Sequence, residues 1–256
     1  MRYIYYALFR HALRVRCWYL DHANGKQARS LPPALMRYRV GESLSPESFL
    51  KVGQGCARHV IDHFARAGIA PVAGMKVLDF GCGCGRILRW LLDDYPGVEF
   101  HGVDTDPDAV RWCESHLPGG HFSAGSPEPP LPYPDAYFRA VYAFSVFTHL
   151  DAVFQDLWLK ELKRILNPDG VLLITVHGAA AARILDEEGR RALAAAGILH
   201  RRSKKLKGIM PGWYNTTWHS PEYIEGRLKA MFHEVRYCAI AEGMQDIVLA
   251  KGPRRI

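Results

Sequence analysis

The sequence lacks the features that would place it outside the ordinary globular proteins. It has no apolar run near the ~18 residues of a membrane-spanning helix. No internal repeat or low-complexity tract is present, and no signal-peptide pattern is found, because the charge-free stretch from Tyr3 to Phe9 is short and is closed by Arg10. At 256 residues, 48% of them hydrophobic, the chain is long enough for one sizeable core. These absences exclude a membrane span and a disordered tail.

Cysteine is sparse, and its spacing predicts neither disulfides nor a metal site. The six cysteines are spread along the chain without a C-x-x-C pair, and a chain of this length needs no disulfide framework. No cluster of histidine and cysteine has the spacing of a metal site. We therefore expect reduced thiols, no metal and a cytoplasmic location. Cys82 and Cys84 are interpreted as small loop-filling side chains rather than nucleophiles.

A general basic surface is also lacking, although the formal net charge is +7. Five positive charges fall between residues 201 and 207, and Arg254 and Arg255 add two more, which accounts for the excess. The rest of the chain is balanced, which disfavours nucleic acid as a partner. Two interpretations of the 201–207 cluster stay open: a solvated loop, or a local contact with a phosphate or an acidic substrate.

Acidic residues are missing from residues 1–20, which contain four arginines. The same segment has a helical stripe of apolar residues, through Ile4, Leu8, Ala12, Val15 and Tyr19. We predict a helical extension over residues 1–44, ahead of a main domain over residues 45–256. A helix docked over the functional site is the favoured interpretation of this extension, and a helix on a membrane surface is the alternative.

From residue 75 onward, short apolar runs alternate with helical patterns, which predicts parallel strands joined by helical crossovers. The predicted strands are Met75–Phe80, Val98–Asp104, His121–Ser123, Tyr137–Phe144 and Val171–Val176. The predicted helices are Ser45–Gly68, Gly85–Asp94, Pro107–His116, Asp151–Leu166 and one opening at Ser220-Pro221. Two final strands, Glu234–Ile240 and Gln245–Lys251, have a connection so short that they must pair antiparallel. The expected fold is α/β: a Rossmann-like, doubly wound, seven-stranded sheet with an antiparallel last strand.

A glycine-rich loop follows the first predicted strand and predicts a nucleoside-containing cofactor. Glycines stand at alternate positions in the sequence Asp79-Phe-Gly-Cys-Gly-Cys-Gly-Arg86, so the backbone can approach a ligand closely. Asp104 ends the next strand, where a carboxylate can accept bonds from ribose hydroxyls. Arg86 stands where a dinucleotide fingerprint needs glycine, and no Gly-Lys-Ser/Thr of a phosphate loop follows. Asp79 suits a cofactor with an ammonium group. The alternative is a tight turn only.

Five motifs along the chain together resemble the class I S-adenosylmethionine-dependent methyltransferases, of the bacterial type that acts on small molecules or glycans. The resemblance covers about residues 45 to 251 and includes the antiparallel terminal hairpin. The motifs lie at residues 77–86, 103–106, 131–138, 145–150 and 166–170. This chain departs from the family in the loop before the fifth strand, where Asp169 stands in place of the more common glycine. The resemblance implies S-adenosylmethionine as the cofactor.

The resemblance assigns the two ends of the cofactor to the first two strands. Asp79 and the backbone of Gly81, Cys82 and Gly83 would hold the methionine end. Asp104 would hold the ribose hydroxyls.

The adenine and the far wall of the site are assigned to the next strands. Thr105 would lie against the adenine, and Phe144 with Ser145 would line the wall after the fourth strand. The family often places an acid after the third strand to read the adenine amino group. Ser126 is the nearest equivalent here.

His149 is the candidate catalytic residue, because the loop after the fourth strand faces the methyl group in this family. A histidine there can take a proton near neutral pH. The alternative is that His149 caps or braces the helix beginning at Asp151. Tyr214 and His219 are second-rank candidates on a segment that could cover the substrate.

Two further absences narrow the range of possible methyl acceptors. The chain has Phe144-Ser-Val-Phe147 where methyltransferases of nucleobase amino groups have Asn/Asp-Pro-Pro-aromatic, and no cysteine lies between residues 113 and 238 for attack on a pyrimidine. A small-molecule or sugar hydroxyl is therefore favoured. The alternatives are an RNA methyltransferase that uses the 201–207 cluster, and a non-catalytic binding protein. Nothing in the sequence predicts an oligomeric state.

Overall fold

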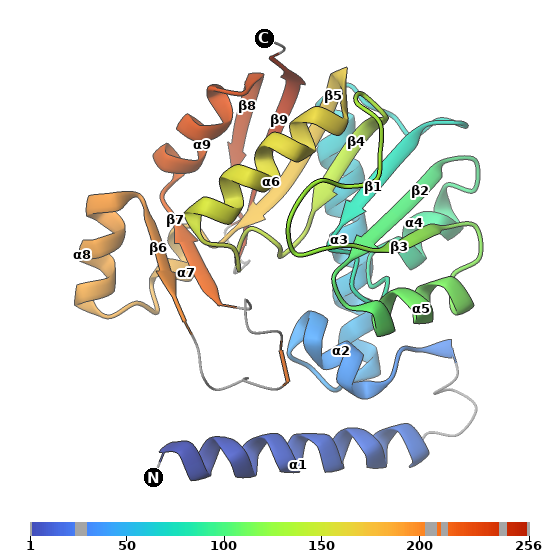
Figure 1. Cartoon of the computed structure of the whole chain (residues 1–256), viewed down its shortest axis with the longest axis vertical. Helices are drawn as coiled ribbons and strands as arrows, with labels where there is room; N and C mark the ends of the chain where they lie inside the picture. The colour runs from blue at the N-terminus through green and yellow to red at the C-terminus, as the bar shows by residue number, and fades with distance from the viewer. Residues whose placement is uncertain (1, 24–29, 203–208, 211–214, 241–244, 255–256) are drawn as a thin grey trace.

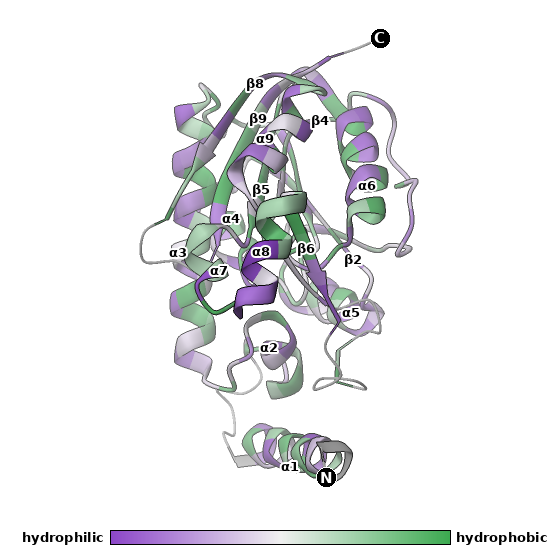
Figure 2. Cartoon of the chain, turned by 90° about the vertical axis from the view of Figure 1, so that its left-hand side faces the viewer, coloured by the Kyte–Doolittle hydropathy of each residue, from purple (hydrophilic) through white to green (hydrophobic). Residues whose placement is uncertain are grey.

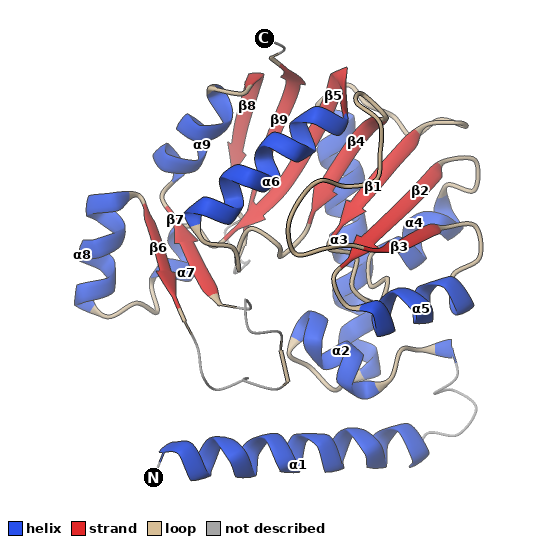
Figure 3. Cartoon of the chain, viewed as in Figure 1, coloured by secondary structure: helices blue, strands red, loops and turns tan. Residues whose placement is uncertain are grey.

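A computed structural model describes residues 2–23, 30–202, 209–210, 215–240 and 245–254. One large sheet runs through the molecule with helices on both of its faces, and the two N-terminal helices lie at one end of it (Figures 1 and 3). Within the described part of the chain, no helix combines the length and the apolar character needed to cross a membrane.

The large sheet has seven strands in the order β3-β2-β1-β4-β5-β9-β8. Strands β1 to β5 pair in parallel, and β9 pairs antiparallel with both β5 and β8. The strands are β1 (Lys76–Phe80), β2 (Glu99–Asp104), β3 (His121–Ala124), β4 (Phe138–Ala143), β5 (Leu166–Val176), β8 (Phe232–Cys238) and β9 (Asp246–Pro253). The predicted fold class is confirmed. The winding direction reverses between β1 and β4, which is where such sheets bind their ligands.

The central strands are apolar on both sides because both faces of the sheet are covered. Leu78 and Val141 face a core shared with helices α6 (Ala152–Ile165) and α9 (Pro221–Lys229). Their neighbours Val77 and Tyr142 face the opposite core, which is shared with α3 (Pro46–Arg66) and α4 (Leu88–Asp94). The period of two along each strand thus sorts the side chains between two hydrophobic cores.

Side-chain caps begin the helices at positions where the sequence has serine or aspartate. Ser45 Oγ accepts a bond from the Ser48 amide at 3.1 Å, and Asp151 Oδ1 accepts one from the Phe154 amide at 3.0 Å. Asp106 caps α5 (Pro107–His116) in the same way. Each cap satisfies an amide that the helix leaves without an internal partner. The predicted starts of α3 and α6 are confirmed.

Three predicted element boundaries are wrong. The helix α4 begins at Leu88 rather than at residue 85, because Gly85 has a φ of +70° that no α-helix contains. The strand β5 begins five residues before the predicted start, at Leu166, which pairs with Phe138 ahead of a register shift. Asp169 therefore lies in a strand rather than in a loop. The strand β8 begins two residues before the prediction, with the fully buried Phe232.

A segment between β5 and α9 adds elements that the sequence patterns did not predict. It contains α7 (Ala179–Ala182), α8 (Glu187–Ala196), β6 (Ile198–Arg201) and β7 (Thr216–His219). The strands β6 and β7 form a separate antiparallel pair, tied to the end of β5 by a bridge between His177 and Trp218. β6 and β7 have only four residues each, and they lie outside the alternation of strands and helices that marked the equally short β3.

The N-terminal helices are α1 (Arg2–Ala23) and α2 (Ala34–Gly41). Leu13 and Cys17 on α1 pack with Ala34 and Tyr38 on α2. The predicted helix is confirmed, and Leu8, Val15 and Tyr19 of its apolar stripe are exposed. The helix that lies over the site is α2, and α1 lies outside it (Figures 1 and 2). The boundary between residues 44 and 45 stays a prediction.

Candidate cofactor and methyl-acceptor site

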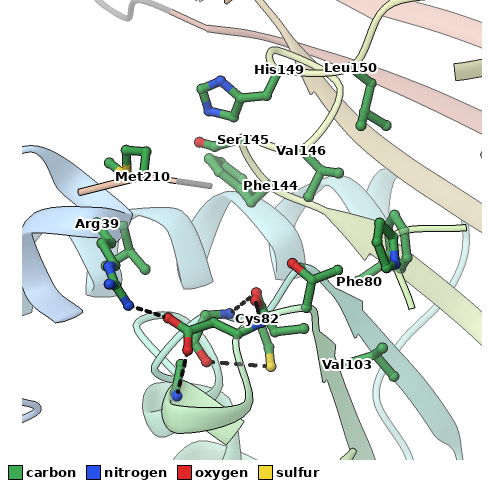
Figure 4. Close-up of a pocket in the computed structure, with 18 of the residues that line it drawn as sticks. Arg39, Phe80, Cys82, Val103, Phe144, Ser145, Val146, His149, Leu150 and Met210 are labelled. Atoms are coloured by element: carbon green, nitrogen blue, oxygen red, sulfur yellow. Dashed lines mark hydrogen bonds and ion pairs between the residues drawn. The ribbon is translucent and has the colours of Figure 1, made fainter. Parts of the chain in front are cut away.

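A cavity of about 630 Å³ opens at the carboxyl ends of β1, β2 and β4 (Figure 4). All of the predicted site residues border it. They are Asp79, Gly81, Cys82, Gly83, Asp104, Thr105, Ser126, Phe144, Ser145 and His149. The structure therefore brings these residues together, although they come from five separate stretches of the chain. The roles assigned to them within the cavity stay predictions.

The glycine loop is both a sharp turn and a close contact. Gly81 has a φ of +84° and Gly83 a φ of +51°, a region that side chains with a Cβ avoid. A Cβ on Gly81 would lie 2.4 Å from Val146 Cγ2, and one on Gly83 would lie 2.5 Å from Val40 Cγ1. Both glycines are required by backbone conformation and by space, so the loop is held in one shape against α2 and the β4 loop.

Asp79 is a buried carboxyl at the end of β1, only 2% exposed. The Tyr142 hydroxyl donates a hydrogen bond to Asp79 Oδ2 at 2.8 Å. Burial nevertheless raises the pKa of Asp79 to about 8, because the charged carboxylate is poorly solvated there. A cation entering the cavity would favour the charged form. Tyr142, which sequence reasoning missed, reaches Asp79 only because β1 and β4 are neighbours.

Asp104 holds the loop as well as facing the cavity. Its Oδ2 accepts from the Gly83 amide at 2.7 Å, and its Oδ1 accepts from the Asp106 amide at 2.8 Å. Burial raises the pKa of Asp104, and these amide bonds act in the opposite direction. Each carboxylate oxygen can accept a second bond, so the group can still receive hydroxyl donors from a ligand.

The cysteines of the loop are thiols rather than thiolates. A hydrogen bond with Cys113 and burial raise the pKa of the Cys82 thiol, and burial raises the pKa of Cys84. All six cysteines of the chain are free of disulfides. Protonated, buried thiols are poor nucleophiles, which agrees with the interpretation of Cys82 and Cys84 as loop fillers. The cytoplasmic location stays a prediction.

Ser145 is held at the far wall by Thr175 of β5 and by Gln245, which directly precedes β9. Its φ of +62° places it in a sharp turn after β4. The Ser145 amide donates to Thr175 Oγ1 at 2.7 Å, and Gln245 Nε2 donates to Ser145 Oγ at 2.9 Å. Gln245 is a further residue that the sequence did not single out. It lies 100 positions away, and only the antiparallel pairing of β9 with β5 brings it here.

His149 stands on the cavity wall opposite the glycine loop (Figure 4). Its Nδ1 lies 2.6 Å from the Asn215 carbonyl oxygen. A carbonyl can only accept, so Nδ1 carries the proton and Nε2 carries the basic lone pair. Burial lowers the pKa of His149 to about 4, which keeps the ring neutral at pH 7. Asp151 itself caps α6, and the interpretation that His149 braces this helix stays open.

Of the two second-rank candidates, His219 does not border the cavity. His219 is 1% exposed, and its Nε2 lies 2.8 Å from Gln155 Nε2. Tyr214 lies outside the described residues.

Sequence reasoning also missed the contribution of the N-terminal extension. Met36, Arg39 and Val40 of α2 border the cavity. Arg39 Nη1 pairs with Asp106 Oδ2 at 2.7 Å, and Arg39 Nε donates to the Ile209 carbonyl oxygen at 3.0 Å. One arginine therefore ties α2, the end of β2 and residue 209 together. Several arginines occur in residues 1–40, so no local sequence pattern distinguishes Arg39 as a residue of the site.

The basic cluster at 201–207 is split by the structure. Arg201 Nη2 pairs with Asp186 Oδ1 at 2.7 Å at the surface. Arg202 borders the cavity, beside His200 from β6. Lys204, Lys205 and Lys207 lie outside the described residues. Arg201 thus fits the interpretation as a solvated surface contact, whereas Arg202 is placed where an acidic group of a substrate could contact it.

Three features define a nucleoside-binding fold of the class I methyltransferase type. They are the doubly wound sheet with an inserted antiparallel strand, the glycine loop after β1 and the acidic residue at the end of β2. Residues 77–170 match a family model described as "Methyltransferase domain". This match and the relatives below support a class I S-adenosylmethionine-dependent methyltransferase.

Comparison with individual proteins agrees with this family. The chain is 33% identical over 138 residues to a fatty-acid O-methyltransferase of Mycolicibacterium smegmatis, covering 53% of this chain and 48% of that protein. It is 26% identical to a demethylmenaquinone methyltransferase of Thermotoga maritima, covering 66% and 62%. The chain thus spans about half to three fifths of the length of these relatives. A solved S-adenosylmethionine-dependent methyltransferase from Mesorhizobium loti shares the fold, with a TM-score of 0.54, 16% identity and coverage of 73% and 94%.

Proposed function

We propose that this chain transfers a methyl group from S-adenosylmethionine to a hydroxyl of a small molecule, with His149 as the general base. The observation that carries the proposal is the state of His149. Its ring is neutral, its Nδ1 proton is held by the Asn215 carbonyl, and it borders the same cavity as the glycine loop. A hydroxyl is a weak nucleophile that benefits from a base, whereas a neutral amine is nucleophilic enough to react without one.

The cavity fits the proposed cofactor at both of its polar ends. The buried Asp79 carboxyl would hold the ammonium group, and Arg86 on the cavity border would face the carboxylate. The glycine loop presents backbone where a Cβ would fill the space, and Asp104 would accept from the ribose hydroxyls. The volume of about 630 Å³ lies within the range of small-molecule sites, roughly 300–1,000 Å³.

The cofactor would supply a methyl group already activated on a sulfonium. The residues of the chain have to align the acceptor and exclude water. His149 Nε2 would accept the proton of the acceptor hydroxyl as the oxygen bonds to the methyl group. The Asn215 carbonyl, which holds Nδ1, would stabilise the resulting imidazolium, as an acceptor behind a catalytic histidine does.

The relatives support a small acceptor. One of them is an O-methyltransferase by name, and its named substrate is a fatty acid. Val146, Leu150 and Phe154 border the cavity near His149, so an acceptor with an apolar portion would find contacts there. A sugar hydroxyl stays within the proposal, because His200, Arg202 and Asn215 add polar groups to the same wall.

Calorimetric titration with S-adenosylmethionine and its demethylated product tests the cofactor. A bound cation favours the carboxylate of Asp79, so binding should release a proton below pH 8. We expect affinity to rise with pH toward about 8 and then level off. Asp79→Asn keeps an acceptor for Tyr142 but removes this titration, so its affinity should be at least about tenfold weaker and its pH dependence flatter.

An acceptor screen with methyl-labelled cofactor then tests the chemistry. Fatty acids, hydroxylated aromatics and sugars should be compared with amines and thiols of similar size. Transfer to a hydroxyl oxygen in the wild type supports the proposal. Transfer to amines alone would overturn the hydroxyl assignment, and absence of cofactor binding in the folded protein would indicate a non-catalytic binder.

A further inference from the structure

The helix α1 has an apolar and aromatic face that is largely exposed in the described structure. Five large side chains on this face are between 52% and 64% exposed. They are Tyr5, Leu8, Val15, Trp18 and Tyr19, which we call the outer face of α1. Leu8, Val15 and Tyr19 are spaced by seven and four residues and so lie on one side of a helix. The opposite side carries Leu13 and Cys17, which are buried against α2.

This concentration of exposed apolar groups is particular to α1. Half of the large hydrophobic side chains that are exposed in the described residues belong to it, and the rest are scattered over other elements, such as Val72 and Ile184. Single exposed apolar residues are ordinary, whereas a contiguous patch marks an interaction surface. Figures 1 and 2 both place α1 at the outside of the molecule, beyond α2.

The charge around the outer face is of one sign. Residues 1–20 contain four arginines and no acidic residue. Arg16 is exposed beside the outer face, and Arg10 is half-buried. The first acid of the chain, Asp21, is used internally, because its Oδ1 accepts from the Ala34 amide at 2.8 Å and so ties α1 to the start of α2. The partner of this surface should therefore be negatively charged.

We infer that the outer face of α1 binds an anionic phospholipid surface, with the helix lying in the plane of the membrane. Tryptophan and tyrosine favour the level of the headgroups, aliphatic side chains enter the acyl boundary, and arginines pair with phosphates. A nucleic acid would use the arginines but offers no apolar layer for Leu8 and Val15. A second copy of the chain would bring arginine against arginine.

This surface is one helix away from the candidate site. The inner side of α1 packs on α2, and Met36, Arg39 and Val40 of α2 border the cavity. Binding through α1 would therefore hold the cavity close to the bilayer, where amphiphilic acceptors are concentrated. This consequence rests on the proposed function, whereas lipid binding itself requires neither cofactor nor acceptor.

Vesicle flotation of the full chain tests the inference. Vesicles of phosphatidylcholine with about 30% phosphatidylglycerol should bind the protein at least about tenfold more tightly than phosphatidylcholine alone, and added salt should weaken binding. The double variant Leu8→Ser/Val15→Ser should bind at least about tenfold more weakly, because its apolar contact is lost. The matched control Val72→Ser/Ile184→Ser removes two exposed aliphatic side chains elsewhere and should bind like the wild type.

Tryptophan fluorescence reports the contact directly. Trp18 is 62% exposed, so its emission should shift to shorter wavelength on anionic vesicles, and Trp18→Phe should abolish that shift while leaving flotation nearly intact. Equal flotation of the Leu8→Ser/Val15→Ser variant and the wild type would overturn the inference. Self-association that this variant abolishes, without vesicle binding by the wild type, would assign the face to a second copy. Neither result depends on methyl transfer.

Discussion

Some residues at the cavity both stabilise the glycine loop and face the ligand position, and Asp104 is the clearest example. Its carboxylate accepts from the Gly83 and Asp106 amides and also faces the cavity. An alanine at this position would free both amides, so the loop would lose its shape together with any ribose contact. Asp79 is the cleaner probe of the cofactor, because its hydrogen-bond partner in the structure is the hydroxyl of Tyr142 rather than the loop backbone.

His149→Gln should separate proton transfer from binding. If His149 Nε2 takes the acceptor proton, turnover should fall by roughly 10²–10⁴-fold while cofactor affinity stays unchanged. The wild-type rate should decline on the acid side near pH 4, the pKa to which burial lowers this ring, and not near the 6.5 of an exposed histidine. The residual rate of the variant should lack that decline. Rates, affinity and melting temperature are to be measured on one preparation.

His177 offers a matched control for this variant. Its Nδ1 also contacts a backbone carbonyl, that of Thr217 at 3.1 Å, and burial lowers its pKa too, but it does not border the cavity. His177→Gln should keep turnover within a few-fold of the wild type. Equal losses of turnover in both variants would assign His149 a structural role only.

At the scale of elements, the N-terminal helix α2 completes the site. Val40 packs against Gly83, and Arg39 pairs with Asp106 at the start of α5. The glycine loop is therefore held from outside the sheet as well as by its own backbone. The segment containing β6 and β7 contributes in the same way, because it delivers Asn215 to His149 and His200 to the cavity wall.

Gly83→Ala should reveal the contact between α2 and the loop. The alanine would adopt a left-handed conformation, at about 1–2 kcal/mol, and its Cβ would lie 2.5 Å from Val40 Cγ1. We expect lower stability and at least about tenfold weaker cofactor binding. Adding Val40→Ala should restore part of both losses, because it removes the steric overlap but not the strained φ.

Gly74 provides the control for backbone strain alone. Its φ is +77°, and no atom lies within 4 Å of its would-be Cβ. Gly74→Ala should lose stability by a similar conformational amount and should leave cofactor affinity unchanged. The double variant Gly83→Ala/Val40→Ala could instead lose cofactor affinity and thermal stability by the sum of the two single losses. That result would show that α2 does not support the loop.

At the scale of the whole molecule, buried histidines should set the acid limit of stability. Burial lowers the pKa of six of them, to about 4 for His101 and His149 and to about 3 for His219. The others are His63, His177 and His200. Each folded pKa lies below the unfolded value of about 6.5, so the unfolded chain takes up these protons first. Their stabilising contribution is present above pH 6.5 and is lost as the pH falls toward 4.

Two buried carboxyls oppose this trend. Burial raises the pKa of Asp79 and of Asp104, so their contribution to stability is greatest at low pH and is lost as the pH rises. The histidines outnumber them, so we expect the free energy of unfolding to fall between about pH 6.5 and pH 4. His149 alone should account for roughly 2–3 kcal/mol of this.

Urea unfolding at pH 7 and at about pH 4.5 measures the effect. His149→Gln should show a shallower loss of stability over this interval than the wild type, because one proton-binding group is removed. A free energy of unfolding that stays constant between these pH values would contradict the prediction.

Features of the fold that depend on neighbouring residues could be predicted from the sequence, and features that depend on distant residues could not. Runs such as Val77–Phe80 and caps such as Ser45 and Asp151 depend on neighbouring residues, so the sheet and most helix starts were predicted correctly. The four-residue strands β6 and β7 were missed because they lie outside the alternation of strands and helices that marked the equally short β3. The start of β5 was misplaced because a bulge opposite Phe138 extends the pairing to Leu166.

By itself, the sequence determined the winding of the sheet, the glycine loop and the placement of Asp79 and Asp104 at the ends of β1 and β2. Those features follow from apolar periodicity and from backbone conformations that only glycine adopts readily. Only the tertiary structure decided which side of α1 is buried, and that Arg39, Tyr142, Asn215 and Gln245 support the site. Such contacts join residues far apart in the chain, and they depend on which strands pair and which helices dock, which no local pattern records.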